Sequence, residues 1–107
     1  MLTGLDGGVA VPTTIVTLDT TLSKCFTVNY TIVRSEAYRT GTLTIISEDG
    51  VNPLSFTDDY TENASTGIIL QLSQSVNTIS IQYTSGGAVE INAAAFSYDI
   101  NYFTLIA

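Results

Sequence analysis

Three acidic side chains close together in the sequence are the groups best suited to chemistry. Asp58, Asp59 and Glu62 fall in one short segment, and Asn63 follows directly. Two carboxyl groups held a few ångströms apart can hydrolyse a glycosidic bond when the pKa of one of them is raised. Carboxylate and amide oxygens are also the ligands that calcium prefers, although the spacing is not that of an EF-hand. The segment could therefore hold a calcium ion, at Asp58, Asp59 and Glu62, or a pair of catalytic acids.

The same acids also have a structural interpretation, in which arginine side chains neutralise them. Arg39, with Arg34 as a further candidate, would pair with Glu62 or Asp58 at one end of the fold. Two arginines facing each other across a hairpin would repel, so the acids are their natural partners. The sequence favours this structural ion pair over the calcium site, and the calcium site over catalysis.

The composition argues against several classes of protein. The chain has no histidine, which removes serine–histidine and cysteine–histidine nucleophile pairs and the usual zinc ligand sets. Lys and Arg number 3 against 10 Asp and Glu, a formal net charge of −7, and no basic patch for nucleic acid is present. Cys25 is the single cysteine, so no internal disulfide can form, and we expect an inert thiol. These features favour a protein that is not an enzyme.

Apolar and polar residues alternate with a period of two in seven segments, and nothing reads at a helical period. As extended strands, segments such as Phe26–Ile32 and Phe96–Tyr102 would have one apolar and one polar face. Strands are predicted at residues 13–18, 24–34, 39–47, 54–60, 67–73, 78–84 and 95–105. Their spacing favours an all-β fold, a single antiparallel β-sandwich of about seven strands, jelly-roll-like or Ig-like. The domain would cover residues 13–107, after a flexible Gly-rich arm over residues 1–12.

The apolar positions also predict how neighbouring strands line up. With Arg34 opposite Arg39, Tyr30 faces Leu43 and the apolar residues of both strands share one face. The next strand along the chain then places Glu62 beside Arg39. The other expected pairs are Ile32 with Gly41, Val28 with Ile45, Phe56 with Ile45, Asp58 with Leu43, Tyr60 with Gly41, Leu70 with Ile81 and Leu72 with Ile79.

Gly41 interrupts a predicted strand with a residue that has no side chain to pack. A neighbouring aromatic ring can cover a glycine in this position. Tyr60 and Tyr30 are the candidates for that ring. We therefore expect Gly41, Tyr60 and Tyr30 to form a structural contact and not the close approach of a ligand.

The last predicted strand runs into the final segment, Phe103-Thr104-Leu105-Ile106-Ala107, which is apolar on both faces. Because an exposed strand of this kind invites aggregation, we expect a partner subunit, in a dimer or trimer, to cover it. The N-terminus lacks the basic start and long apolar run of a signal peptide, and no segment reaches the ~18 apolar residues of a membrane span. We expect synthesis in the cytoplasm and no membrane insertion.

Five short motifs follow one another along the chain. They are Tyr30-Thr31-Ile32-Val33-Arg34, Tyr38-Arg39-Thr40-Gly41-Thr42-Leu43-Thr44-Ile45, Leu54-Ser55-Phe56-Thr57-Asp58-Asp59-Tyr60, Ile81-Gln82-Tyr83-Thr84 and Phe96-Ser97-Tyr98. In this order they resemble a small β-sandwich domain of bacteriophage tail-fibre and other virion appendage proteins. The resemblance covers most of the chain.

That resemblance implies a non-enzymatic structural or adhesive module that faces a receptor and acts as an oligomer in the virion. Its partners would be further copies of the chain, other virion proteins or a cell-surface glycan. It carries over no catalytic residues. The alternative from another class is a stand-alone carbohydrate-binding module, assisted by calcium at Asp58, Asp59 and Glu62.

Overall fold

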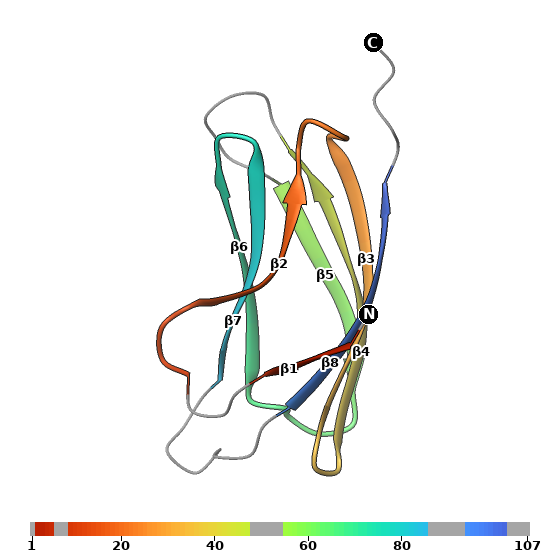
Figure 1. Cartoon of the computed structure of the whole chain (residues 1–107). Helices are drawn as coiled ribbons and strands as arrows, with labels where there is room; N and C mark the ends of the chain where they lie inside the picture. Colours follow the sequence, from red (N-terminus) through yellow and green to blue (C-terminus); the bar gives the residue numbers. More distant parts are fainter. Residues whose placement is uncertain (1, 6–8, 48–54, 86–93, 103–107) are drawn as a thin grey trace.

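The structure is a computed structural model of the chain, and it describes residues 2–5, 9–47, 55–85 and 94–102. The strands are β1 (Leu2–Leu5), β2 (Thr13–Asp19), β3 (Cys25–Arg34), β4 (Ala37–Ile46), β5 (Ser55–Glu62), β6 (Ile68–Ser75), β7 (Thr78–Ser85) and β8 (Ala94–Tyr102). The larger sheet has the order β1-β8-β3-β4-β5 and the smaller one the order β2-β7-β6, with neighbours antiparallel. The two sheets pack face to face (Figure 1), so the predicted antiparallel β-sandwich is confirmed. In these ranges no helix is long and apolar enough to cross a membrane.

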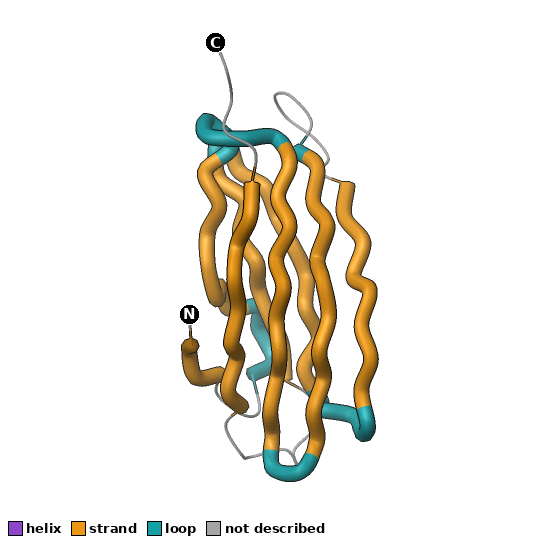
Figure 2. The backbone as a smooth tube through the Cα atoms, turned by 90° about the vertical axis from the view of Figure 1, so that its right-hand side faces the viewer, coloured by secondary structure: helices purple, strands orange, loops and turns teal. Residues whose placement is uncertain are grey.

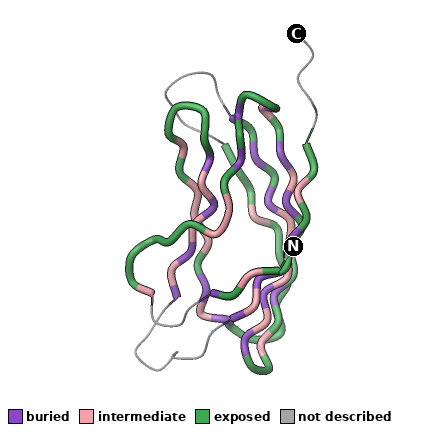
Figure 3. Tube along the Cα trace, in the orientation of Figure 1, coloured by how far each residue is buried: buried purple, intermediate pink, exposed green. Residues whose placement is uncertain are grey.

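Burial alternates along the strands as the sequence pattern predicts. In β3 every second side chain from Phe26 to Arg34 is buried, and those between them are exposed or half-buried. In β7 the buried side chains include Ile79, Ile81 and Tyr83. Figure 3 shows this alternation along the strands of both sheets. Because successive side chains of a strand point to opposite faces, each sheet turns one apolar face towards the other sheet.

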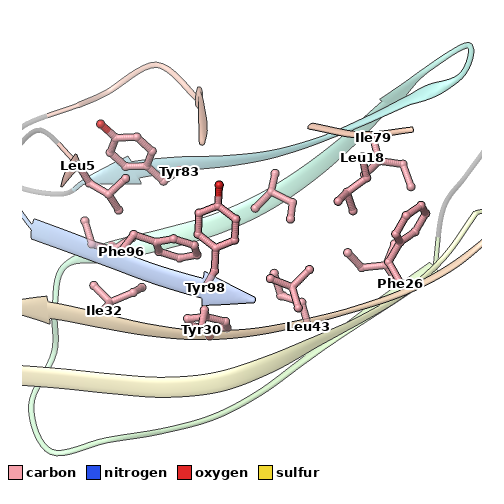
Figure 4. Close-up of a cluster of buried hydrophobic side chains, with 14 of the residues drawn as sticks. Leu5, Leu18, Phe26, Tyr30, Ile32, Leu43, Ile79, Tyr83, Phe96 and Tyr98 are labelled. Carbon is pink, nitrogen blue, oxygen red and sulfur yellow. The ribbon is translucent and has the colours of Figure 1, made fainter. Parts of the chain in front are cut away.

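The core fills the space between the two sheets and contains a group of aromatic rings (Figure 4). The Phe96 ring lies 5.5 Å from the Tyr30 ring, nearly parallel to it, and 5.6 Å from the Tyr98 ring. Pairs at such distances contribute about 0.5–1.5 kcal/mol beyond the area they bury. The buried apolar residues are Leu5, Leu18, Phe26, Val28, Tyr30, Ile32, Leu43, Ile45, Ile68, Ile79, Ile81, Tyr83, Ala94, Phe96 and Tyr98.

Strand register agrees with the sequence prediction in one place and differs by two residues in two others. The β4–β5 pairs are as predicted: Arg39 with Glu62, Gly41 with Tyr60, Leu43 with Asp58 and Ile45 with Phe56. In the β3–β4 hairpin, however, Arg34 pairs with Ala37, so its predicted pairing with Arg39 is wrong. The other corrected pairs are Tyr30–Gly41, Ile32–Arg39, Val28–Leu43, Leu70–Tyr83 and Leu72–Ile81.

Two-residue turns explain the corrected register. Ser35 and Glu36 alone connect β3 to β4, and Val76 and Asn77 alone connect β6 to β7. Ser35 and Val76 adopt left-handed backbone angles, with φ of 55° and 50°, as the tightest hairpin turns require. A shift by two residues keeps every side chain on its face, so the alternation alone could not distinguish the two registers.

The N-terminus contributes a strand that the sequence pattern did not indicate. Leu2–Leu5 form β1, which pairs with Ala94–Ser97 of β8. Leu5 is buried in the core, and the Val9 N–H donates to Ser85 Oγ at 2.9 Å. Residues 2–5 therefore belong to the sheet and not to the arm predicted over residues 1–12. A four-residue strand is too short to produce a visible alternation.

Strand β8 lies inside the larger sheet for only part of its length. It pairs with β3 from Ala95 to Tyr102, whereas β1 covers its other edge only from Ala94 to Ser97. In the described part of the chain, no strand lies beside that edge from Tyr98 onward. The apolar residues 103–107, predicted to extend this strand, lie outside the described residues.

Candidate functional site

Three adjacent strands bring several of the predicted charged and aromatic residues together. Tyr30 on β3, Arg39 on β4 and Asp58 on β5 occupy positions on the inner face of the larger sheet. Arg39 forms an ion pair with Asp58 through Nη2 and donates a hydrogen bond from Nε to Tyr30 Oη at 3.1 Å. Its Nη1 donates to the Ile68 carbonyl, also at 3.1 Å, and Tyr30 Oη donates to Asp58 Oδ1 at 2.6 Å. We call Tyr30, Arg39, Asp58 and Tyr60 the Arg39 cluster.

Tyr60 completes the surroundings of the guanidinium group. The Arg39 Cζ atom lies 3.7 Å from the centre of the Tyr60 ring, a close cation–π contact. Burial and the hydrogen bond to Asp58 raise the pKa of Tyr30 well above its ordinary value, against an opposing effect of the Arg39 charge. Each guanidinium nitrogen thus has a partner inside the protein, and the Tyr30 phenol keeps its proton. This arrangement stabilises the fold and offers no free acid or base.

Gly41 makes room for this cluster. A Cβ atom placed on Gly41 would lie 2.7 Å from Tyr60 Cβ, 2.8 Å from the Asp59 carbonyl oxygen and 2.9 Å from Tyr30 Oη. Distances this short are not tolerated between unbonded atoms, and one of these neighbours is backbone. Gly41 therefore has the structural contact with Tyr60 and Tyr30 that the sequence predicted.

The three acids predicted as metal ligands are separated by the strand itself. Asp58 points inward to Arg39, whereas its neighbour Asp59 lies exposed on the opposite face of the sheet. Glu62 is exposed at the end of β5, where its Cα pairs with that of Arg39. Among the described residues, no group of three or more acidic or cysteine side chains could hold a metal ion. Asp58 and Asp59 cannot share a ligand or a proton.

The two arginines bind the segment that crosses from the larger to the smaller sheet. Arg34 Nη1 donates to the Thr66 carbonyl at 2.9 Å, and Arg39 reaches the Ile68 carbonyl two residues further on. An ion pair between Arg34 and Asp58 was another arrangement predicted from the sequence. The ion pair that the structure gives Asp58 is with Arg39. Hydrogen bonds from buried, charged donors each contribute about 1.5–3 kcal/mol. Both arginines therefore hold the sandwich closed at this end.

Asn63, just after β5, has a structural role that its position in the sequence did not reveal. Its Oδ1 accepts a hydrogen bond from the Tyr38 N–H at 2.7 Å, and its Nδ2 donates to the Glu36 carbonyl at 3.1 Å. The side chain thus fastens the β3–β4 hairpin to the end of β5. Both partners lie in or next to the β3–β4 turn, far from Asn63 in the sequence, so a local pattern could not indicate this contact.

The outer face of the larger sheet is the largest feature that the site predictions missed. Across β8, β3, β4 and β5 it presents three rows of four polar residues. These are Ser97, Thr31, Thr40 and Thr61; Asp99, Asn29, Thr42 and Asp59; and Asn101, Thr27, Thr44 and Thr57. We call these twelve residues the hydroxyl face. In Figure 2 its strands lie side by side towards the viewer, and no described segment crosses in front of them.

Part of the hydroxyl face is hollowed. A shallow hollow of about 400 Å³ is lined by Asn29, Tyr30, Thr31, Thr40, Gly41, Thr42, Ser97, Tyr98 and Asp99. The hydroxyl groups of Thr31 and Thr40 lie 3.2 Å apart, and Thr42 Oγ1 donates to Asn29 Oδ1 at 2.9 Å. These contacts orient the polar groups, and each hydroxyl and amide keeps further capacity for hydrogen bonds.

A second hollow, of about 500 Å³ and mostly apolar, adjoins the row that contains Thr27. It is lined by Cys25, Phe26, Thr27, Thr44, Ile45, Ile46, Asn101 and Tyr102. Tyr102 and Ile46 are about half exposed, and the free thiol of Cys25 is exposed. The hydroxyl face therefore continues directly into an apolar surface.

No family model, curated protein sequence or solved structure matches the chain. The choice between the candidate sites must therefore come from their chemistry. A third hollow, of about 390 Å³, opens beside Arg39, Tyr60 and Glu62, but the guanidinium nitrogens there are already bound within the protein. The hydroxyl face, by contrast, has exposed hydroxyl, amide and carboxylate groups in a regular array. It is the better candidate for binding.

The signal for the hydroxyl face was present in the sequence. Polar residues alternate with the core residues in all four strands, so a single face had to be polar throughout. Which polar residues lie beside one another depends on the register, and the register of β3–β4 was predicted two residues away from its actual position. The composition of the three rows therefore follows only from the observed pairing.

Proposed function

We propose that this protein is a non-enzymatic adhesive or structural module that works as an oligomer, in the manner of a phage-like virion appendage. The observation that carries the proposal is the hydroxyl face, a broad polar surface on a rigid sheet. Thr, Ser, Asn and Asp side chains in such an array can recognise a partner through many weak hydrogen bonds. Because the chain has no histidine, no imidazole lies beside these hydroxyl groups to activate one of them as a nucleophile.

The charged residues support a non-enzymatic role in the same way. Asp58 and Arg39 neutralise each other inside the sandwich, and Asp59 lies on the other side of the sheet. Glycosidase chemistry needs two carboxyl groups that flank one bond, and Asp58 and Asp59 do not face a common space. A calcium-assisted form of carbohydrate binding has no support from this pair for the same reason.

We place self-association at the edge of β8 that no described strand covers from Tyr98 onward. From Tyr98 to Tyr102 this edge carries one acidic residue, Asp99, whereas the β5 edge carries two exposed acids, Asp59 and Glu62. Charges protect strand edges from pairing, so β5 is the better protected of these two edges. A second copy that adds a strand beside β8 would form backbone hydrogen bonds along this edge and extend the sheet.

Sedimentation of the full chain at about 10 µM tests this proposal. We expect a dimer or trimer, because strand addition at an open edge forms a series of backbone hydrogen bonds. Asn101→Lys, which adds a charge at the β8 edge, should shift the protein towards monomer. Thr57→Lys, in the same row at the opposite edge of the sheet, is the matched control and should leave the oligomer intact. A monomeric wild-type protein, or equal effects of the two substitutions, contradicts the proposal.

The adhesive part has its own test. The oligomer, labelled isotopically throughout so that no side chain is modified, should bind to bacterial cells from a panel of strains. Because avidity raises the apparent affinity of an oligomer, it should bind more strongly per chain than the same protein diluted below the concentration at which the oligomer dissociates. Equal or absent binding of both forms to every strain in the panel counts against an adhesive role.

A further inference from the structure

We infer that the hydroxyl face is a metal-independent binding site for a neutral saccharide chain. This inference rests on the proposed adhesive function and names the class of receptor that it would take. Three features support it: the donors and acceptors of the face, its charge, and the apolar hollow at its end.

Saccharides and the hydroxyl face have matching hydrogen-bonding groups. A sugar hydroxyl is both donor and acceptor, and so are the hydroxyl groups of Thr31, Thr40 and Thr42. Asn29 adds an amide, and Asp99 beside it adds a carboxylate, which accepts strong hydrogen bonds from hydroxyl donors. These groups line the same 400 Å³ hollow. They could bind adjacent hydroxyl groups of one sugar ring.

The charge of the face selects for a neutral ligand. Asp59 and Asp99 are the only ionisable residues among the twelve, and no Lys or Arg belongs to the face. An anionic saccharide, with carboxylate or sulfate groups, would meet two carboxylates and no counter-charge, on a chain of net charge −7. A neutral chain meets no such repulsion, and its binding should change little with ionic strength.

The apolar hollow provides the second kind of contact that sugars use. One side of a pyranose ring consists largely of C–H groups, which pack well on aromatic and aliphatic surfaces. Ile46, whose half-exposed side chain lies on the same face of the sheet as Thr27 and Asn101, offers such a surface in the hollow that adjoins them. A chain of several rings that runs along the strands would place one ring on the polar hollow and another on the apolar hollow. A single monosaccharide could fill only one of them.

A second copy of this protein is a poorer occupant for the hydroxyl face. Two such faces in contact would lose water from many hydroxyl groups while burying little apolar area. They would also bring the Asp59 and Asp99 carboxylates of both copies into one interface. The open edge of β8, perpendicular to this face, remains available for self-association while the face is occupied.

Titration of the full chain with neutral oligosaccharides, followed by amide NMR spectra, tests the inference. The probes are gluco-, manno-, galacto- and N-acetylglucosamine oligomers of four to six rings, with oligogalacturonate as the anionic comparison. At least one neutral oligomer should bind with a Kd at or below about 1 mM, and its monosaccharide at least tenfold more weakly. The shifted amides should lie in β3, β4 and β8, and chelator should not alter the affinity. No binding by any neutral oligomer, or shifts confined to the groove beside Tyr60, would overturn the inference.

Isosteric substitutions separate the ligand site from the fold. Thr31→Val with Thr42→Val removes two hydroxyl groups of the face but keeps β-branched side chains, and should weaken binding at least tenfold. Thr17→Val with Thr84→Val makes the same change on the outer face of the smaller sheet and should leave binding unchanged. Equal affinity in the two double variants contradicts the assignment. An oligomer that adheres to cells but binds no saccharide would refute this inference and leave the proposed function standing.

Discussion

Gly41 and Tyr60 lie directly opposite each other on neighbouring strands, so close that a methyl group on Gly41 would meet the Tyr60 Cβ atom at 2.7 Å. The same methyl group would approach Tyr30 Oη, which binds Arg39 and Asp58. One missing side chain therefore allows four neighbouring side chains to form the Arg39 cluster.

Gly41→Ala should lower the free energy of unfolding by about 1–3 kcal/mol, the usual effect of overpacking a filled site. The backbone contact to the Asp59 carbonyl cannot relax by a side-chain rotation alone. Gly4→Ala is the matched control, because a Cβ atom at Gly4 meets nothing within 4 Å. That variant should be neutral or slightly stabilised. Urea unfolding of both proteins measures the difference, and equal stabilities would contradict this account of Gly41.

Asp58→Asn should destabilise the protein by about 2–4 kcal/mol, because it leaves the buried Arg39 guanidinium without its counter-charge. Asp59→Asn changes the adjacent residue on the solvent-facing side and should stay within about 0.5 kcal/mol of the wild-type protein. Arg39→Lys keeps the charge but loses the planar group that binds Tyr30 Oη and the Ile68 carbonyl, so it should not restore stability. Thermal unfolding at pH 7 compares the three. Similar losses for Asp58→Asn and Asp59→Asn would exclude the Arg39 cluster as a source of stability.

Tyr30 makes the fold sensitive to alkaline pH. Its pKa is raised by burial and by the bond to Asp58, so the folded protein keeps a proton that the unfolded chain releases near pH 10. Above that pH the folded state binds more protons than the unfolded state, and stability falls as pH rises, by up to about 1.4 kcal/mol per pH unit. Below about pH 10, Tyr30 adds no pH dependence to the stability. Tyr30→Phe should be less stable at pH 7, through the lost hydrogen bonds, but should lose less on going from pH 9 to pH 11. Equal losses in the two proteins over that range would contradict the assignment.

The sequence predicted which face of its strand a residue occupies better than which residue of the next strand lies beside it. Alternation is local, so the inward positions of Val28, Ile45 and Ile81 followed from the pattern, as did their burial. Register and end contacts depend on residues far apart in the chain. The pairing of Asp58 with Arg39 was one of several alternatives, and the contact of Asn63 with the β3–β4 turn was not foreseen.

Turn length was the missing information in both hairpins. Neither Ser35–Glu36 nor Val76–Asn77 contains the glycine or the Asn-Gly pair that normally indicates a two-residue turn. The chain nevertheless closes these turns by placing Ser35 and Val76 in the left-handed region. The two-residue error in the predicted register follows from these unusual turns.

Val76 is the more strained of the two turn residues, which leads to a last prediction. A β-branched residue at φ 50° is a true outlier, because its Cβ crowds the following carbonyl, at about 1–2 kcal/mol. The side chain is 77 % exposed, so it contributes little packing in return. Val76→Gly should therefore raise the free energy of unfolding by up to about 1 kcal/mol, as should Val76→Asn.

Asn77→Gly in the same turn is the control for the Val76 substitutions. Asn77 does not have a positive φ, so glycine there relieves no strain and only adds freedom to the unfolded chain. It should lower stability by about 0.5–1 kcal/mol. Urea unfolding at pH 7 gives the free energy of unfolding of the three variants and so ranks them by stability. If Val76→Gly proved less stable than the wild-type protein, the left-handed conformation at Val76 would not be a source of strain.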